Sequence, residues 1–318
     1  MRRIIMKFGI IGTNWITDQF IAAASNHAEF TIGAVYSRTE EKAREFADQY
    51  DVKNVFTNME EMFQSGTIDA VYIATPNVFH AEQSILALQN GIHVLCEKPA
   101  VTSVSEIEEV IKASEEHQTT YMEAMKSTVT PAFLNLKNQI GKIGQIRRFV
   151  FHFNQYSSRY DKYKDGIIEN AFKPELGNGA RMDLGVYCIA PLVHLVGKPN
   201  SVVNNTHRLS TGAEGQGSMI LNYDDFEAII MYSKITDSFL PSEIQGEKGV
   251  IEIDKISKPE KMRIKYRDGE SEDLSVEHAF DSMYYEAAEF IKTVNNQQIE
   301  SSINTHDISR KITEILTK

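Results

Sequence analysis

The sequence predicts an α/β protein of two domains: a parallel sheet covered by helices on both faces, then an α+β domain built on an open, mostly antiparallel sheet. A chain of 318 residues exceeds the usual size of one domain. Strand-like and helix-like segments alternate over residues 1–124, which is typical of parallel sheets. Over residues 125–318, runs that alternate apolar and polar residues become prominent.

Composition excludes several classes of protein. A formal net charge of −11 argues against nucleic-acid and anionic-membrane partners, because both bind basic surfaces. Two cysteines and nine scattered histidines indicate neither a disulfide framework nor a metal site, which favours a reduced, cytoplasmic chain. Lys7 interrupts the apolar N-terminal residues, so this segment predicts a strand and not a signal peptide. No apolar run approaches the ~18 residues that span a bilayer.

The first elements predict a βαβ unit. Residues 5–12 form a buried strand that ends in a glycine turn, and residues 13–25 form the following helix. Residues 30–36 form the second strand. Thr39 is a good N-cap for the next helix, which has acidic residues in its first turn. Two parallel strands joined in this way imply a right-handed crossover.

The alternation continues beyond this unit. Asn58 and Glu61 suggest a capping box for a short helix. The elements that follow are a strand over 69–75, a helix from about Val78 to Gly91, a strand over 92–96, and a helix that Ser103 or Ser105 opens and that runs to His117. This order predicts a parallel sheet with helices on both faces.

The second domain shows a strand pattern with one solvated face. Residues 144–156 alternate, with Phe149, Phe151 and Phe153 on one side and Arg148, His152 and Asn154 on the other. Further strand-like runs lie near 216–222, 227–235 and 250–253. Helices that begin near Ser282 and Thr305 end the chain. The pattern predicts a mostly antiparallel sheet that is covered on one face.

The glycine turn after the first strand is a candidate dinucleotide site, comprising Gly9, Gly12, Thr13, Asn14 and Trp15. Asn14 replaces the second glycine of the usual fingerprint, and Thr17 replaces the third. Asparagine tolerates left-handed backbone geometry better than other non-glycine residues, so the loop can persist. A strand-turn-helix corner without a ligand explains the same residues equally well.

The residues after the second strand bear on the choice of cofactor. No acidic residue stands where one would bind the ribose hydroxyls of NAD. Ser37, Arg38 and Lys42 instead provide hydrogen-bond donors and positive charge that suit a 2′-phosphate. They favour NADP, with NAD as a possible second cofactor. The alternative interpretation is a solvated arginine on an exposed turn.

The segment from Thr75 to His80 has both a structural and a functional interpretation. Pro76 ends a strand and Asn77 caps the helix that follows, which alone explains both residues. The segment also lies where a loop would line the nicotinamide ribose, so Thr75, Pro76, Asn77 and His80 are candidate cofactor contacts. The two interpretations are compatible.

Two further stretches are candidates for the chemistry. Glu97 and Lys98 follow a short buried strand, and Pro99 ends its pairing, so Lys98 is expected at the carboxyl end of a strand, where ligands bind. Asp183 and Tyr187 are four residues apart, hence on one face of a helix expected from about Met182 to Gly197. Pro191, on the same helix, predicts a kink just after this pair. An acid that favours the helix dipole and a half-buried tyrosine would explain Asp183 and Tyr187 without any ligand.

These stretches, in this order and spacing, resemble the glucose-fructose oxidoreductase / inositol dehydrogenase (Gfo/Idh/MocA) family, and the late stretch 246–253 extends the resemblance along the chain. Tyrosine at position 187 resembles the dihydrodiol dehydrogenase and glucose-fructose oxidoreductase branch. The resemblance implies an N-terminal Rossmann domain, a C-terminal domain whose open sheet often mediates dimerisation, and NAD(P)-dependent oxidation of a sugar, polyol or diol. It implies that Tyr187 is the acid/base group and that Lys98 is its electrostatic partner and also binds the substrate. It further implies that Asp183 orients the substrate and Lys98.

Some residues depart from the family pattern. Asn14 and Thr17 loosen the fingerprint, and residues 123–128 lack the aromatic residue and arginine expected ahead of Pro131. The substrate of the branch is therefore not transferred. A non-catalytic, dinucleotide-responsive regulator on the same fold is the alternative function, and a linear acid or an imine is an alternative substrate. Aromatic and cationic residues over 156–177 suit a hydroxylated substrate, but surface loops commonly have this composition.

Overall fold

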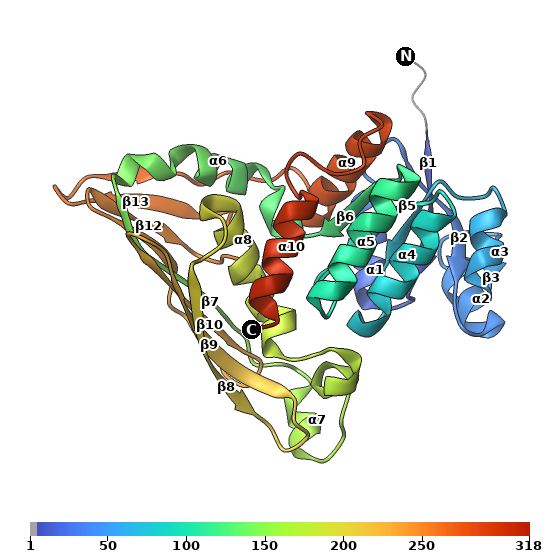
Figure 1. Cartoon of the computed structure of the whole chain (residues 1–318), viewed down its shortest axis with the longest axis horizontal. Helices are drawn as coiled ribbons and strands as arrows, with labels where there is room; N and C mark the ends of the chain where they lie inside the picture. The colour runs from blue at the N-terminus through green and yellow to red at the C-terminus, as the bar shows by residue number, and fades with distance from the viewer. Residues whose placement is uncertain (1–4) are drawn as a thin grey trace. The chain divides into compact units, whose positions relative to one another are not determined.

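The computed structural model describes residues 5–318, and the first residues of the segment weighed as a signal peptide lie outside this range. The chain forms two compact units, the first comprising Met1–Lys126 and Phe280–Arg310 and the second Ser127–Ala279 and Lys311–Lys318 (Figure 1). The sequence assigned everything after residue 124 to one domain. In the structure Phe280–Arg310 group with the first unit.

The first unit contains a six-stranded sheet in the order β3-β2-β1-β4-β5-β6. Every neighbouring pair in it is parallel. Its strands are β1 (Met6–Ile11), β2 (Phe30–Tyr36), β3 (Val55–Phe56), β4 (Ala70–Ile73), β5 (His93–Glu97) and β6 (Tyr121–Ala124). This strand order is that of a dinucleotide-binding Rossmann fold, whose ligands bind at the carboxyl ends of the strands.

Helices cover both faces of this sheet because each buried strand presents apolar side chains to both sides. The helices are α1 (Trp15–Ala24), α2 (Glu40–Asp48), α3 (Met59–Gln64), α4 (His80–Gln89), α5 (Val104–His117) and α9 (Ser282–Asn295). The last helix, α10 (His306–Leu316), begins in this unit and belongs to the second unit from Lys311 onward. One core joins the sheet to α1, α2 and α9, and another joins it to α3, α4 and α5. Ser103 and Glu106 form the capping box of α5.

The second unit contains an eight-stranded sheet in the order β14-β13-β12-β11-β7-β10-β9-β8. Its strands are β7 (Ile146–Asn154), β8 (Ser201–Arg208), β9 (Glu214–Asn222), β10 (Glu227–Ser233), β11 (Ser242–Gly246), β12 (Gly249–Ile253), β13 (Met262–Tyr266) and β14 (Ser271–Asp273). Only β7 and β10 pair in parallel. The expected fold class, a Rossmann unit followed by a mostly antiparallel sheet, is confirmed.

One face of the second sheet is covered and the other is open. Phe149 and Phe151 of β7 are fully buried, as the alternation predicted. The helices of this unit, α6 (Pro131–Gln139), α7 (Tyr160–Lys164) and α8 (Val186–Val196), leave the outer face of the sheet bare in Figure 1. The helical stretch Pro174–Val196 is long and apolar enough to cross a membrane, but 72% of its apolar window is buried inside the protein, as in a core helix.

Candidate active site

Hydrogen bonds stabilise the turn between β1 and α1. Gly12 has a φ of 108°, and a Cβ there would lie 2.5 Å from the carbonyl oxygen of Ala74, so only glycine fits. Asn14 is the N-cap of α1: its side chain accepts from the Ile16 N–H (3.0 Å) and donates to the Ala74 carbonyl (2.7 Å). Its φ of −135° is extended, so the expected left-handed geometry is wrong for Asn14 and is found at Gly12. Thr17 donates to the Gly12 carbonyl (2.6 Å).

The other residues of the fingerprint differ in their surroundings. Gly9 lies inside β1, where a Cβ would approach side-chain atoms of Ile68 (2.9 Å) and Val71 (3.2 Å), so close packing explains this glycine. The helix begins at Trp15, two residues later than predicted, because Asn14 caps it. Thr13 is half-buried, and Trp15 is 56% exposed. Thr13 and Trp15 therefore remain available to a ligand at the N-terminus of α1.

Ser37, Arg38 and Lys42 follow the carboxyl end of β2. Ser37 is half-buried, and the side chains of Arg38 and Lys42 are exposed. Nearby Arg44 is held by Glu40 at 3.5 Å, whereas no side-chain hydrogen bond or ion pair engages Arg38 or Lys42 within residues 5–318. The positive charges of Arg38 and Lys42 are therefore available to bind a 2′-phosphate.

His80 connects the loop after β4 to the loop after β5. Its ring nitrogens lie 2.9 Å from the carbonyl oxygens of Thr75 and Pro99. Burial lowers the pKa of His80, and the contacts with the two carbonyl oxygens oppose this shift. Pro76 precedes a 3₁₀ turn that begins at Asn77, and α4 begins only at His80. The prediction that Asn77 caps the helix is therefore wrong.

Lys98 directly follows β5, where the sequence placed it. The buried Glu97 accepts two hydrogen bonds, one from the Tyr72 hydroxyl (2.5 Å) and one from the Lys98 backbone N–H (3.1 Å). The peptide bond between Lys98 and Pro99 is cis. Glu97 thus fixes the backbone from which the Lys98 side chain extends.

The carboxyl groups of Glu123 and Glu286 are almost fully buried in this unit. Glu123 of β6 accepts from the Ala100 N–H at 2.9 Å, so it lies in the core and not in a substrate-facing loop. Burial raises the pKa of Glu123 to about 7 against this hydrogen bond and one from Ser309. Glu286 of α9 is fully buried, and burial followed by the charge of Glu97 raises its pKa well above the usual range.

We expect Glu123 to make stability fall as the pH rises. Its folded-state pKa lies above the model-peptide value, so the folded state binds the proton more tightly, and this stabilisation is lost between about pH 4.5 and about pH 7. The shift corresponds to about 3 kcal/mol. Glu123→Gln should abolish this part of the pH dependence in thermal unfolding. Glu116→Gln, at an exposed site on α5, is the control, and equal pH dependence in both variants would contradict the prediction.

Asp183 and Tyr187 lie on one helical stretch of the second unit. A π-helical turn, Arg181–Gly185, carries Asp183 and leads directly into α8, which carries Tyr187. The Tyr187 side chain is buried, with its ring edge-on to that of Phe153 at 5.7 Å. Asp183 Oδ2 lies 2.8 Å from Lys234 Nζ. A π turn is common at functional sites because it offsets the side chains that follow it.

Pro191 lies inside α8, and the kink expected just after Asp183 and Tyr187 stays a prediction. The α-helix runs without interruption through Pro191 to Val196, and the widened turn lies upstream, at Asp183. Pro191 removes one N–H donor in the middle of this helix. Gly197 ends the helix, as predicted.

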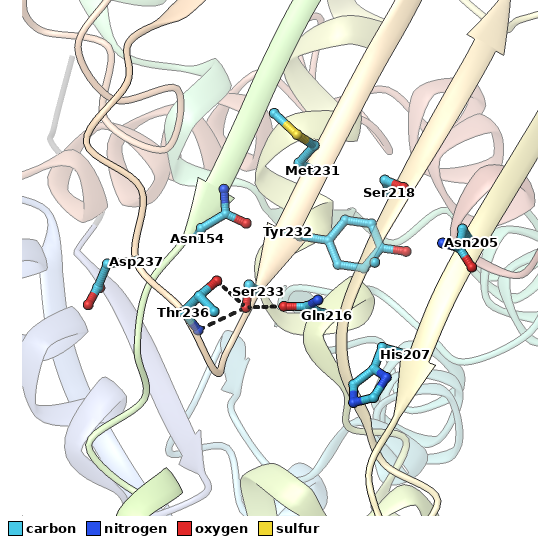
Figure 2. A pocket seen from close by; sticks show the side chains of 11 residues that line it. Asn154, Asn205, His207, Gln216, Ser218, Met231, Tyr232, Ser233, Thr236 and Asp237 are labelled. Carbon is cyan, nitrogen blue, oxygen red and sulfur yellow. Dashed lines mark hydrogen bonds between the residues drawn. The ribbon is translucent and has the colours of Figure 1, made fainter.

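A hollow of about 290 Å³ lies in the second unit near the end of β10 (Figure 2). Polar side chains line much of it, and Ser233 there accepts hydrogen bonds from the backbone N–H and the hydroxyl of Thr236, both at 3.0 Å. Asn205 and Ser218, on β8 and β9, form part of its wall. None of the predicted catalytic residues lines this hollow.

Comparison with known proteins identifies the family. Residues 6–125 match the family described as "Oxidoreductase family, NAD-binding Rossmann fold", and residues 138–252 match the "GFO/IDH/MocA C-terminal domain". The chain belongs to the Gfo/Idh/MocA family. The expected enzyme class, an NAD(P)-dependent oxidoreductase, is therefore confirmed.

Three relatives within the Gfo/Idh/MocA family illustrate its range. The chain is 47% identical to scyllo-inositol 2-dehydrogenase (NADP(+)) IolU of Bacillus subtilis, over 98% of this chain and 95% of that protein. It is 40% identical to the uncharacterized oxidoreductase YgjR of Escherichia coli, over 93% and 90%. It is 30% identical to trans-1,2-dihydrobenzene-1,2-diol dehydrogenase of Xenopus laevis, over 78% and 74%.

Solved structures share the Gfo/Idh/MocA fold. A 3-ketoreductase from Actinomadura kijaniata, in complex with TDP-benzene and NADP, superposes with a TM-score of 0.83 at 21% identity, covering 98% of this chain and 95% of that one. An aldose-aldose oxidoreductase from Caulobacter crescentus, with glycerol, gives 0.85 at 18% identity over the same shares. At these identities the comparison supports the fold alone.

The candidate site residues divide between the two units. Gly12, Arg38, Thr75 and Lys98 follow the carboxyl ends of β1, β2, β4 and β5 in the first unit, and Asp183 and Tyr187 lie in the second. Sequence reasoning missed Lys234, which it placed inside a strand. The signal that could have identified Lys234 was a single cation in an otherwise apolar run.

Proposed function

We propose that this chain is an NADP-dependent dehydrogenase of a cyclic polyol or sugar and that Lys98, Asp183 and Tyr187 carry the reaction. The observation that carries the substrate class is 47% identity over 98% of the chain to a scyllo-inositol 2-dehydrogenase that uses NADP(+). Hydroxyl groups on adjacent carbons of such a substrate require several hydrogen-bonding partners at fixed positions. One ammonium, one carboxylate and one phenol meet that need.

The proposed roles follow from the chemistry of the three groups. Tyr187 exchanges the proton of the reacting hydroxyl, because oxidation of a carbinol must release it. Lys98 stabilises the negative charge that develops on the substrate oxygen and on Tyr187. The Asp183 carboxylate accepts a hydrogen bond from a neighbouring substrate hydroxyl and thereby orients the substrate ring. The Glu97 contacts hold the Lys98 backbone in one conformation.

The first unit fits a dinucleotide. Gly12 permits the tight turn into α1, since a Cβ there would meet the Ala74 carbonyl, and the N-terminus of α1 favours an anionic group. Ser37, Arg38 and Lys42 would hold a 2′-phosphate. Bound NADP would accept hydride from the carbinol carbon.

Cofactor binding is the first test of this proposal. Titration with NADPH and then NADH should quench the emission of Trp15, the single tryptophan, which is exposed at the N-terminus of α1. We expect tighter binding of NADPH. Arg38→Gln should weaken NADPH binding ~10- to 100-fold and leave NADH binding unchanged, because it removes a charge-assisted hydrogen bond. Arg44→Gln is the control, since Arg44 already pairs with Glu40.

Turnover tests the substrate class. NADP reduction should be measured with scyllo-inositol, other inositols, aldoses and linear polyols. Oxidation of an inositol or an aldose supports the proposal. Saturable NADPH binding without turnover of any of these compounds would refute it and would favour the regulatory alternative.

The proposal includes a homodimer formed through the open face of the second sheet. A row of apolar side chains crosses four neighbouring strands of this face: Val203, Ile220, Ile229 and Val150. Val203 is 61% exposed and Ile220 is 42% exposed. Such a row suits burial against a second copy. The hollow of Figure 2 lies beside this row, because Asn205, Ser218 and Met231 form the next one.

Light scattering tests the dimer. Ile220→Glu places a charge in the middle of the apolar row and should convert dimers to monomers. Ile167→Glu is the control, since Ile167 is 58% exposed and lies outside the sheet. A monomeric wild-type protein would contradict the proposal.

The proposed cytoplasmic location agrees with two buried, free cysteines.

A further inference from the structure

A buried lysine lies beside Asp183. Lys234 is the first residue after β10, and its Nζ is 2.8 Å from Asp183 Oδ2. The same Nζ donates to the carbonyl oxygen of Ala171 at 3.1 Å and lies 5.3 Å from the centre of the Phe172 ring. Three neighbours from two segments therefore fix the position of this ammonium.

The two members of this ion pair differ in exposure. The side chain of Lys234 is 4% exposed, and that of Asp183 is 37% exposed. An ammonium this deeply buried requires a counter-charge, because transfer of a charge out of water is costly. The lysine is anchored inside the protein, while the carboxylate also has a side toward solvent. The anchored ammonium of Lys234 therefore sets the orientation of the Asp183 carboxylate.

We propose that Lys234 is a positioning residue that holds the Asp183 carboxylate ionised and in one orientation, so that it can accept a substrate hydroxyl. This inference rests on the proposed function, in which Asp183 contacts the substrate. Lys234 itself does not touch the substrate, because its ammonium is enclosed by Asp183, Ala171 and Phe172.

Other charged or titratable groups lie on the elements packed against the π turn. Arg181, on the turn itself, pairs with Glu214 of β9 at 3.5 Å, and the Tyr232 hydroxyl of β10 donates to the same carboxylate at 3.1 Å. Burial, and then the charge of Glu214, raises the pKa of Tyr232, so it stays protonated. Tyr187 lies on α8, and His152 of β7 is in register with Met231 on the open face. Lys234 thus pairs directly with the acid, whereas the pair of Arg181 and Glu214 is a separate contact.

Kinetics of Lys234 variants test the inference. Lys234→Met removes the charge and nearly preserves the length of the side chain, so kcat/KM for the polyol should fall ~10- to 100-fold, chiefly through KM. The loss should be larger near pH 6 than near pH 8, because an unpaired carboxylate near aromatic side chains takes up a proton more readily. NADPH affinity should not change. Lys234→Arg should restore much of the activity, and Lys258→Met, at an exposed ion pair, should behave as wild type.

A second measurement needs no turnover. The ¹³C signal of the Asp183 carboxylate, assigned by its loss in Asp183→Asn, can be titrated in protein labelled at aspartate. In Lys234→Met its midpoint should move to higher pH, and in Lys258→Met it should not. Lys234→Gln replaces the methionine variant if that variant fails to fold.

The outcomes separate the two proposals. Absence of turnover in the wild-type protein would remove the proposed function, while the titration would still decide whether Lys234 controls Asp183. An unchanged Asp183 midpoint in the folded Lys234 variants would show that Lys234 serves packing alone and would overturn the inference. An equal fold-loss of kcat/KM at every pH would also overturn the inference.

Discussion

Replacement of Tyr187 by phenylalanine should lower turnover ~10²- to 10⁴-fold, the usual contribution of a general acid or base. The variant keeps the ring that packs edge-on against Phe153 at 5.7 Å, so the fold and the cofactor site should be preserved. NADPH affinity, measured through Trp15, should be nearly unchanged, because the tyrosine lies in the second unit. A fall in kcat without a matching rise in KM would identify an interaction made in the transition state.

The control for this experiment is a tyrosine outside the candidate site. Tyr266 of β13 donates a hydrogen bond to Glu272 at 2.9 Å, so Tyr266→Phe also removes a paired hydroxyl group. Its turnover should equal that of the wild type. Full activity in Tyr187→Phe would exclude Tyr187 from the mechanism, and the acid/base group would have to be sought elsewhere.

Much of the fold could be predicted because it depends on local patterns. Alternation of strands and helices predicted the parallel sheet, and Lys98 was correctly placed after β5 because Pro99 prevents further pairing. The return of α9 to the first unit could not be predicted. An amphipathic helix requires an apolar partner, and the sequence does not specify which sheet supplies it. Met283 and Phe290 pack into the core that contains Phe8 and Tyr72.

The candidate site could be predicted only where its residues are neighbours in the sequence. The turn at Gly12 and the pair of Asp183 and Tyr187 are of this kind. The contact between Asp183 and Lys234 joins segments distant in the sequence, and no local pattern indicates it. The extended conformation of Asn14 was missed for a different reason. Helix capping and a hydrogen bond to the Ala74 carbonyl determine it, and both favour extended backbone over a left-handed turn.

Replacement of Lys98 by methionine should lower kcat ~10²- to 10³-fold, the usual cost of removing one group that stabilises developing negative charge. The backbone N–H of Lys98 donates to the Glu97 carboxylate, and the substitution leaves this hydrogen bond in place, so the loop should keep its conformation in the variant. Lys112→Met is the control, since Lys112 is 70% exposed on α5 of the same unit. NADPH binding in Lys98→Met shows whether the loss arises in the chemical step or in the cofactor site.

The double variant Lys98→Met, Tyr187→Phe decides whether the two residues act as one unit. If Lys98 acts mainly by stabilising the ionised tyrosine, its removal costs little once the hydroxyl is gone, so the double variant should be no more than about tenfold slower than Tyr187→Phe alone. If the two groups act independently, the factors multiply, and turnover should fall ~10⁴-fold or more. The non-additive result would show that Lys98 and Tyr187 are coupled in the same step. Strict additivity of the two losses would mean that Lys98 acts on the cofactor. Tyr187 would then transfer the proton without assistance from Lys98.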